Sequence, residues 1–323
     1  MKENRVRESL LSALAIGTVS GEESAQKLNV TRAAVWKQIG ALRDDGYSIV
    51  GDARGYRLLE EGKRAYEVSL LRAFAGEGRR VICLPVTGST NRDLRDLALA
   101  GAPAGTLVVS ERQTEGRGRL GRSFASPAGG VYFSLLLRPN LPLPDAAAIT
   151  GAVAVAAADA LETLSGLPVG IKWVNDLYVH DKKIAGILCE AALNLESGTP
   201  DYVIAGIGIN LSGELPPELA GIATSVEREG GTVPNRATLI AATVRGIERL
   251  AADPLAPSVI AESRRRSVLF GREVTVSRGN ETFRALVTGI TDRGELALKT
   301  PDGRETVLSS GEVSVHLARG EKP

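Results

Sequence analysis

Metal-binding and disulfide-forming side chains are scarce in this chain of 323 residues, which has only two cysteines and two histidines. Cys83 and Cys189 each lie inside an apolar run, so we expect two buried, reduced thiols rather than a disulfide or a metal-binding pair. His180 and His316 are too few to form a His/Cys metal cluster. The composition therefore excludes disulfide-stabilised folds and zinc modules.

An excess of either charge is also absent, because 39 lysines and arginines balance 38 acidic residues and give a formal net charge of +1. At this balance the whole molecule does not attract a nucleic acid, so such binding requires a local basic patch. Apolar residues make up 43% of the chain and charged residues 24%, which is ordinary for a globular protein.

Long apolar runs are missing too. The longest, residues 146–158, is rich in alanine and falls short of the roughly 20 residues that cross a bilayer, so it predicts a buried helix. The first residues have neither the apolar core nor the cleavage site of a signal peptide. We therefore expect a cytoplasmic protein that makes no contact with a membrane.

The order of the predicted elements divides the chain into three domains of an α+β fold. Residues 1–64 read as three helices and a hairpin, the order of a winged helix-turn-helix. Residues 65–268 alternate short apolar strands with helices and predict a mixed α/β domain. Residues 269–323 contain only short strands and turns, enough for a small five-stranded barrel.

The elements of the central domain follow from short, β-branched apolar runs and from longer helical patterns. Strands are expected at residues 81–86, 107–109, 131–137, 169–174, 184–189 and 203–209. Helices are expected at residues 90–100, 145–165 and 236–252.

The third helix of the first domain, which Thr31 is placed to cap, is the DNA-binding candidate. Val35, Ile39 and Leu42 share its apolar face, and residues 31–43 contain cations but no acid. The candidate contacts to phosphates and base edges lie off that face or in the wing, and they are Thr31, Arg32, Lys37, Gln38, Arg43 and Arg54. The alternative is an interaction module whose basic face is merely solvated. Because one winged domain makes few phosphate contacts, operator binding requires a dimer on a two-fold site.

A glycine-rich and arginine-rich loop runs from Gln113 to Arg122. Its glycines satisfy the dinucleotide-binding pattern G-x-G-x-x-G, but loop residues follow where that fingerprint requires a helix, so a Rossmann site is rejected. Guanidinium groups bind phosphate or carboxylate oxygens in pairs, and glycines let the backbone close over a ligand. Arg117, Arg119 and Arg122 therefore predict a site for an anion, against the alternative of a solvated basic loop.

A second motif combines residues 172–178, KWVNDLY, with residues 182–188, KKIAGIL. A hairpin that pairs the two segments would bring Lys172 and a second lysine to one ligand, with Asn175 and Asp176 at its turn; chemistry alone does not choose between Lys182 and Lys183. The oxygens of Asn175 and Asp176 suit Mg²⁺ bound to phosphates, although the same residues are also ordinary turn formers. The third motif, residues 206–210, predicts a strand that the backbone of another element approaches closely.

Together these motifs resemble those of bifunctional biotin–protein ligases that also act as biotin operon repressors. The matching segments are residues 30–46, 88–91, 113, 116–122, 172–178, 183–188 and 206–210. The resemblance spans nearly the whole chain and implies a winged helix-turn-helix, a ligase domain like that of class II synthetases and a C-terminal SH3-like barrel. Its loop motif and its K-W-x-N-D-L-Y motif are highly specific.

The resemblance implies that biotin and ATP form biotinyl-5′-adenylate, which a lysine of a biotin carboxyl carrier domain then attacks. The implied catalytic residues are Lys183, Arg117 and Arg119, which settles the choice between the two lysines. Implied biotin contacts are Ser89, Thr90, Asn91, Gln113, Arg117, Gly118, Arg119 and Lys183. Implied ATP or adenylate contacts are Arg117, Arg119, Arg122, Lys172, Asn175, Asp176 and Asn210, with Mg²⁺ at Asn175 and Asp176.

Three departures from the family pattern concern packing. Val174 stands where the family usually has proline, Phe124 stands where tryptophan is common, and no aromatic residue occurs near Ala223 to cover an adenine. The rival interpretations are a lipoate–protein ligase, a repressor whose ligase domain only senses a small molecule, and a ligase whose winged domain no longer binds DNA. We also hypothesise that adenylate orders the arginine loop and promotes a homodimer that binds operator DNA.

Overall fold

The computed structural model of the protein describes residues 2–194, 196, 198–278, 281–309 and 312–315. The chain forms two compact units. One consists of residues 1–83 and 235–241, and the other of residues 84–234 and 242–323. The domain boundaries predicted after residues 64 and 268 remain predictions.

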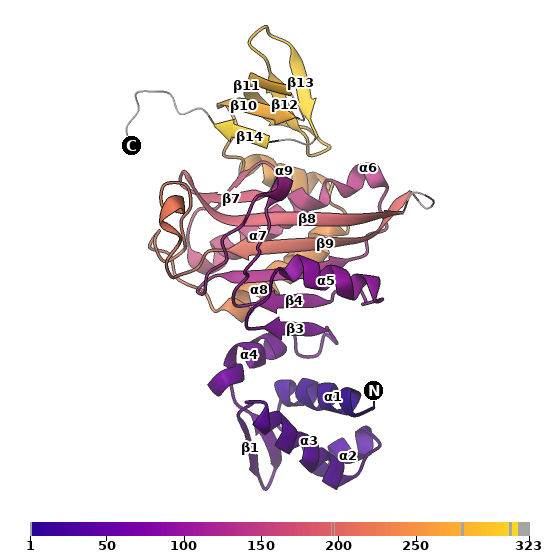
Figure 1. Cartoon of the computed structure of the whole chain (residues 1–323). Coiled ribbons are helices and arrows are strands. Elements are labelled where there is room, and N and C mark those ends of the chain that lie inside the picture. The colour runs from indigo at the N-terminus through magenta and orange to yellow at the C-terminus, as the bar shows by residue number, and fades with distance from the viewer. Residues whose placement is uncertain (1, 195, 197, 279–280, 310–311, 316–323) are drawn as a thin grey trace. The chain divides into compact units, whose positions relative to one another are not determined.

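The first unit begins with three helices and a two-stranded hairpin (Figure 1). The elements are α1 (Lys2–Ile16), α2 (Gly21–Lys27), α3 (Arg32–Asp44), β1 (Ile49–Asp52) and β2 (Gly55–Leu58). The cap expected at Thr31 is present, since its Oγ1 accepts the N–H of Ala34 at 3.1 Å, and Ser20 Oγ likewise accepts the N–H of Glu23. The predicted apolar face of α3 is buried in the core of this unit.

The backbone of the wing approaches the segment between α1 and α2 closely at one point. Val19 and Tyr56 exchange two backbone hydrogen bonds, each 2.9 Å long. Gly55 has φ +129°, and a Cβ there would lie 2.3 Å from the carbonyl oxygen of Val19, so only glycine fits. The strands, helices and wing together confirm the winged helix-turn-helix.

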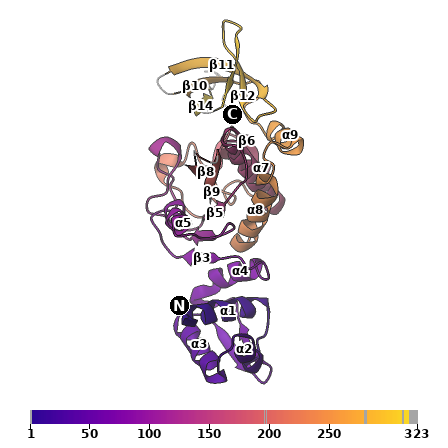
Figure 2. The same cartoon turned by 90° about the vertical axis from the view of Figure 1, so that its right-hand side faces the viewer.

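The central domain is built on a seven-stranded sheet of order β3-β4-β5-β9-β8-β7-β6. Its strands are β3 (Val81–Leu84), β4 (Leu107–Ser110), β5 (Val131–Leu137), β6 (Gly170–Lys172), β7 (Asp176–Val179), β8 (Lys182–Asn194) and β9 (Thr199–Ile209). Helices α5 (Thr90–Leu99) and α7 (Ile149–Ser165) lie on opposite faces of this sheet (Figure 2). The predicted α/β ligase fold is confirmed.

The apolar helix predicted from residues 145–165 is present as two pieces, α6 (Leu143–Ala146) and α7, and Ala147 and Ala148 between them keep near-helical dihedral angles. Residues 143–165 are long and apolar enough to cross a membrane, but 56% of the window is buried inside the domain. In the described part of the chain this is a core helix, as expected.

Several short elements were not predicted, because segments of four to nine residues are too short to show a clear period. They are α4 (Ala65–Ala73), α9 (Pro257–Arg265) and β7, which accompany the expected α8 (Arg236–Ala251). Both cysteines are free thiols, as expected, and burial raises the pKa of the Cys189 thiol to about 11. Cys83 is partly exposed, so the expectation that it is buried was wrong. Apolar neighbours in the sequence did not guarantee burial, because β3 has every residue partly exposed.

The C-terminal domain contains the five predicted strands as an antiparallel sheet of order β13-β12-β11-β10-β14. The strands are β10 (Glu273–Arg278), β11 (Glu281–Ile290), β12 (Leu296–Lys299), β13 (Glu305–Leu308) and β14 (Glu312–Val315). Its buried core includes Trp173 of the central domain, whose Nε1–H donates to the Gly294 carbonyl at 3.0 Å. Val174, in place of the family's usual proline, packs against the same core.

A buried arginine joins α7 and α9 within the second unit. Arg266 is 6% exposed, and its guanidinium donates to Glu262 at 2.7 Å, to Glu162 and to the carbonyl of Val169 at 3.0 Å. Nε and Nη1 thus have acceptors, and Nη2 lies 3.6 Å from Asp159 Oδ1, so the buried charge is paired with carboxylates. Hydrogen bonds from Arg265 first, and then from Arg266, lower the pKa of Glu262 to about 2.

We predict that Glu262→Gln lowers the thermal unfolding midpoint by a few degrees at pH 7 and by much less near pH 3. A carboxylate whose folded pKa lies below its unfolded value of 4.5 adds stability above pH 4.5, and this stability is lost as the pH falls toward 2. Differential scanning calorimetry of both proteins across pH 3 to 7 measures the gap. A gap that stays constant with pH would contradict the assignment.

Candidate functional site

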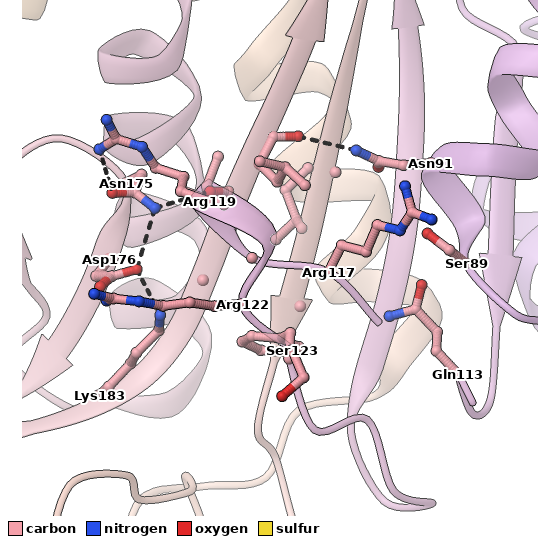
Figure 3. A pocket seen from close by; sticks show the side chains of 18 of the residues that line it. Ser89, Asn91, Gln113, Arg117, Arg119, Arg122, Ser123, Asn175, Asp176 and Lys183 are labelled. Carbon is pink, nitrogen blue, oxygen red and sulfur yellow. Dashed lines mark hydrogen bonds and ion pairs between the residues drawn. The ribbon is translucent and has the colours of Figure 1, made fainter. Parts of the chain in front are cut away.

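A cavity of about 180 Å³ lies where α5, the arginine loop and β6 to β9 meet (Figure 3). It gathers every predicted ligase residue except Asn210. The residues brought together are Ser89, Thr90, Asn91, Gln113, Arg117, Gly118, Arg119, Arg122, Lys172, Asn175, Asp176 and Lys183. Asn210 is buried and donates from Nδ2 to the carbonyl of Thr224 at 3.0 Å, so the structure does not place it in the cavity wall.

The cavity is strongly positive. Five cationic side chains line it, and Asp176 is the one carboxylate among the described lining residues. The guanidinium of Arg117 has no hydrogen-bond partner among the residues that the structure describes, and it projects toward Ser89 and Gln113 (Figure 3). Such an arrangement attracts an anion, because opposite charge offsets the mutual repulsion of the cations.

Lys183 and Asp176 form the central ion pair of the site. Lys183 Nζ lies 2.6 Å from Asp176 Oδ1, and Asp176 is a neighbour of Gly186 across the β7–β8 pair. The backbone of Lys183 is fixed by two hydrogen bonds to the segment at Ile222 and Thr224. The position from which the Lys183 side chain projects is therefore held on both sides of its peptide backbone.

The predicted hairpin between the two lysine segments is present as β7 and β8, but Asn175 and Asp176 do not form its turn: they lie at the preceding turn, between β6 and β7. Lys172 pairs with Asp176, which begins β7, and β7 in turn pairs with β8. Leu177 and Val179 alternate with partly exposed residues, which is a strand pattern that the turn-forming Asn175 and Asp176 obscured. Both lysines still reach the same cavity.

The arginine loop closes on itself as a tight hairpin. The N–H of Gly118 donates to the Arg122 carbonyl at 2.7 Å, and the N–H of Phe124 donates to the Gly116 carbonyl at 2.8 Å. Arg119 leaves this loop and donates to Asn175 Oδ1 at 3.2 Å. The loop thus carries its arginines over the ends of β6 and β7.

The N-terminus of α5 opens onto the other end of the cavity. Ser89 is the N-cap residue, 3% exposed, and its hydroxyl makes no capping bond. The amide oxygen of Gln113 caps the helix instead, accepting the N–H of Thr90 at 2.9 Å, while Nε2 donates to Ser126 at 2.9 Å. The Ser89 hydroxyl has no partner among the described residues and faces the cavity.

Glycines in the central strands let other elements come close, as the sequence predicted for residues 206–210. A Cβ on Gly206 would lie 2.0 Å from Asn91 Oδ1, and one on Gly208 would lie 2.4 Å from Phe124 Cε1. Gly186 also touches the Phe124 ring. The ring of Phe124, in place of the family's common tryptophan, therefore packs over Gly186 of β8 and Gly208 of β9.

Sequence reasoning assigned no contact to several lining residues, although most of them lie within the three motifs or next to the arginine loop. They are Ser123, Phe124, Trp173, Ile187, Leu188, Ile207 and Val313. The ring of Tyr178 lies 5.6 Å from Lys172 Nζ, and burial together with the charge of Asp176 raises the pKa of Tyr178 to about 12. Only the distant Val313 gave no signal, because it belongs to the last domain.

The candidate DNA contacts in α3 and the wing differ in exposure and in their contacts within the protein. Arg43 Nε donates to the Ile49 carbonyl at 2.9 Å and ties α3 to β1, and Gln38 is half-buried. Arg32 and Lys37 are exposed, as is Arg54 in the turn between β1 and β2. Trp36, which is 68% exposed, lies on the same solvent-facing side of α3 and was not predicted as a contact.

Comparison with known families divides the chain in the same order. Residues 83–210 match the biotin/lipoate A/B protein ligase family, residues 269–315 match the biotin protein ligase C-terminal domain, and residues 7–57 match a helix-turn-helix domain. The fold and the site thus define a protein ligase of the biotin class that carries a helix-turn-helix.

Individual relatives narrow the class. The chain is 34% identical over 304 residues to the bifunctional ligase/repressor BirA of Bacillus spizizenii, with 90% of this chain and 92% of the relative covered. It is 31% identical to BirA of Escherichia coli, with 98% and 99% covered. The biotin protein ligase from Aquifex aeolicus, solved with biotin and ATP, matches with a TM-score of 0.63 at 29% identity, covering 74% of this chain and 99% of that chain. The chain belongs to the bifunctional ligase/repressor BirA family.

We predict that Gly208→Ala lowers ATP-dependent biotin adenylation roughly ten-fold or more, because the methyl group displaces the Phe124 ring and overpacking of this kind costs about 1 to 3 kcal/mol. Pyrophosphate release measures the rate. Gly151→Ala is the matched control, since a Cβ there meets nothing within 4 Å. Equal rates for the two variants would contradict the proposed packing.

Proposed function

We propose that the cavity activates biotin with ATP to biotinyl-5′-adenylate and then transfers biotin to a lysine of a biotin carboxyl carrier domain. The observation that carries the proposal is the convergence of Lys183, Arg117 and Arg119 on one cavity in which Asp176 is the one carboxylate among the described residues. A mixed carboxylic–phosphoric anhydride needs cations around it and no protein nucleophile.

The biotin head group is assigned to the α5 end of the cavity. There the free hydroxyl of Ser89 and the remaining Nε2 hydrogen of Gln113 offer a neutral donor and acceptor set for a ureido ring. Thr90 and Asn91 shape this end through bonds to other protein groups. The carboxylate of biotin then points toward the arginine loop and Lys183.

The triphosphate is assigned to the opposite end, among Arg119, Arg122 and Lys172. As the biotin carboxylate attacks the α-phosphorus, Lys183 and Arg117 stabilise the negative charge that develops on the bridging and phosphoryl oxygens. Pyrophosphate leaves. In the second step, the neutral amine of a carrier lysine attacks the acyl carbon, an amide forms, and AMP is the leaving group.

Magnesium fits the site as a partner of the phosphates. Asp176 Oδ2 and Asn175 Oδ1 are hard oxygens on adjacent residues, while Asp176 Oδ1 pairs with Lys183. No group of three or more His, Cys, Asp or Glu side chains suited to a metal occurs among the described residues, so the nucleotide would supply most of the ligands. Bound there, Mg²⁺ would neutralise phosphate charge.

We predict that Lys183→Ala lowers biotinyl-adenylate formation about 100-fold or more, because a preorganised cation at a developing charge contributes on that order. Lys182→Ala is the matched control, as this adjacent lysine is exposed and outside the cavity. Single-turnover adenylate formation followed by mass spectrometry measures both. Equal losses in the two variants would refute the assignment of Lys183.

The winged domain supports a second role, repression by binding operator DNA as a homodimer that forms when adenylate is bound. Arg32, Lys37 and Arg54 are exposed, and they stand on α3 and the wing of a confirmed winged helix-turn-helix. Two such domains on a two-fold site would double the phosphate contacts. These activities belong to a cytoplasmic protein that makes no contact with a membrane.

We predict that DNA affinity rises at least ten-fold when biotin and ATP are added, and that Arg32→Ala weakens binding and reduces the slope of log affinity against log salt by about one per protomer. The probe is a duplex that the full-length protein selects from a random library. Fluorescence anisotropy measures binding, with Arg249→Ala as an exposed control. Unchanged affinity on adding both substrates would reject the coupling.

A further inference from the structure

The side chain of Asn91 contacts three neighbouring strands, β5, β9 and β8. Its side chain leaves α5 and lies over Gly206 of β9, where a Cβ would come within 2.0 Å of it. On one side, Ser134 Oγ of β5 donates to Asn91 Oδ1 at 2.6 Å. On the other, Asn91 Nδ2 donates to the Leu188 carbonyl of β8 at 3.2 Å (Figure 3). Ser134 and Leu188 are the register partners of Gly206 in the two adjacent strands.

Glu190 accepts hydrogen bonds from Asn91 and from a second residue of α5. Asn91 Nδ2 donates to Glu190 Oε2 at 2.7 Å, and the guanidinium of Arg95 donates to Glu190 Oε1 at 2.5 Å. Asn91 and Arg95 are four residues apart and so lie on the same face of α5. The carboxylate of β8 therefore clamps two successive turns of the helix at the cavity.

The charge of Glu190 decides which way the Asn91 amide points. In the observed orientation both Nδ2 hydrogens have acceptors, the Leu188 carbonyl and the carboxylate, and Oδ1 accepts from Ser134. A flipped amide would place its oxygen against both acceptors, which is unfavourable near a partly buried carboxylate. With Glu190 neutral, the two orientations become closer in energy.

A series of hydrogen bonds connects the Asn91 amide with Gln113 at the proposed biotin end of the cavity. Ser134 Oγ lies 2.6 Å from Asn91 Oδ1 and 2.7 Å from Thr90 Oγ1, and Thr90 Oγ1 lies 3.2 Å from the amide oxygen of Gln113. A hydroxyl has a single hydrogen, so a change at Asn91 alters what Ser134 offers to Thr90. Gln113, at the far end of this series of hydrogen bonds, lines the cavity.

We infer that Glu190, held by Arg95, is a positioning residue that fixes the biotin end of the cavity through the Asn91 amide. The inference rests on the proposed assignment of biotin to the α5 end. Glu190 itself is not among the residues that line the cavity. Its effect on the ligand is therefore indirect, and it acts on biotin and not on ATP.

The test is Glu190→Gln in the full-length enzyme, with steady-state kinetics for each substrate and calorimetric titration of biotin alone. We expect KM and Kd for biotin to rise about ten-fold, the cost of one misoriented hydrogen-bonded group, while kcat and KM for ATP stay unchanged. Asp292→Ala is the control, because it removes a similarly short ion pair, Arg264 to Asp292 at 2.6 Å, whose carboxylate is 95% exposed.

A double-mutant cycle separates positioning from general stability. If Glu190 acts through Asn91, then Glu190→Gln adds nothing to the biotin KM of Asn91→Ala, whereas independent effects would multiply. Multiplying effects, an unchanged biotin Kd in Glu190→Gln, or equal changes for both substrates would overturn the inference. Failure of the wild-type protein to bind biotin at all would instead refute the proposed function, so the two failures are distinguishable.

Discussion

Like charges crowded into one small cavity are the constraint around which this ligase domain is arranged. Five cationic side chains share the space with Asp176 as the one carboxylate among the described lining residues. The fold holds them apart by giving several a local partner: Asp176 pairs with Lys183, Asn175 accepts from Arg119, and the rings of Tyr178 and Phe124 lie within 6 Å of Lys172 and Lys183. An anionic substrate would complete the balance of charge, which is the physical basis of the proposed binding of phosphate and carboxylate groups.

The charged side chains lie close to the sheet because glycines in its central strands leave room for the elements that carry them. Gly206 and Gly208 leave room on β9 for Asn91 and Phe124, so that α5 and the arginine loop approach the sheet from two directions. Polar bonds then lock the approach, with Glu190 and Ser134 on either side of Asn91. The α5 end of the cavity is thus rich in neutral hydrogen-bonding side chains, while Arg119, Arg122 and Lys172 lie at the proposed phosphate end.

Much of this was accessible from the sequence, because local patterns carry it. The cap at Thr31, the alternating strands and the loop of arginines and glycines predicted three domains and all but one of the proposed ligase contacts in the cavity. What failed depends on tertiary pairing. β7 is only four residues long and was hidden by turn formers, Asn210 proved to serve the backbone of Thr224, and Val313 reaches the cavity from another domain. Such contacts have no local signal.

The central claim is that the cationic cavity makes an acyl-adenylate of biotin and passes it to protein. Intact mass spectrometry of a biotin carboxyl carrier domain, incubated with the full-length protein, biotin and MgATP, tests this most directly. The account predicts one biotin added to a single lysine, with no addition when ATP is omitted and none when lipoate replaces biotin. An unmodified carrier with biotin and MgATP, or modification by lipoate instead, would contradict it.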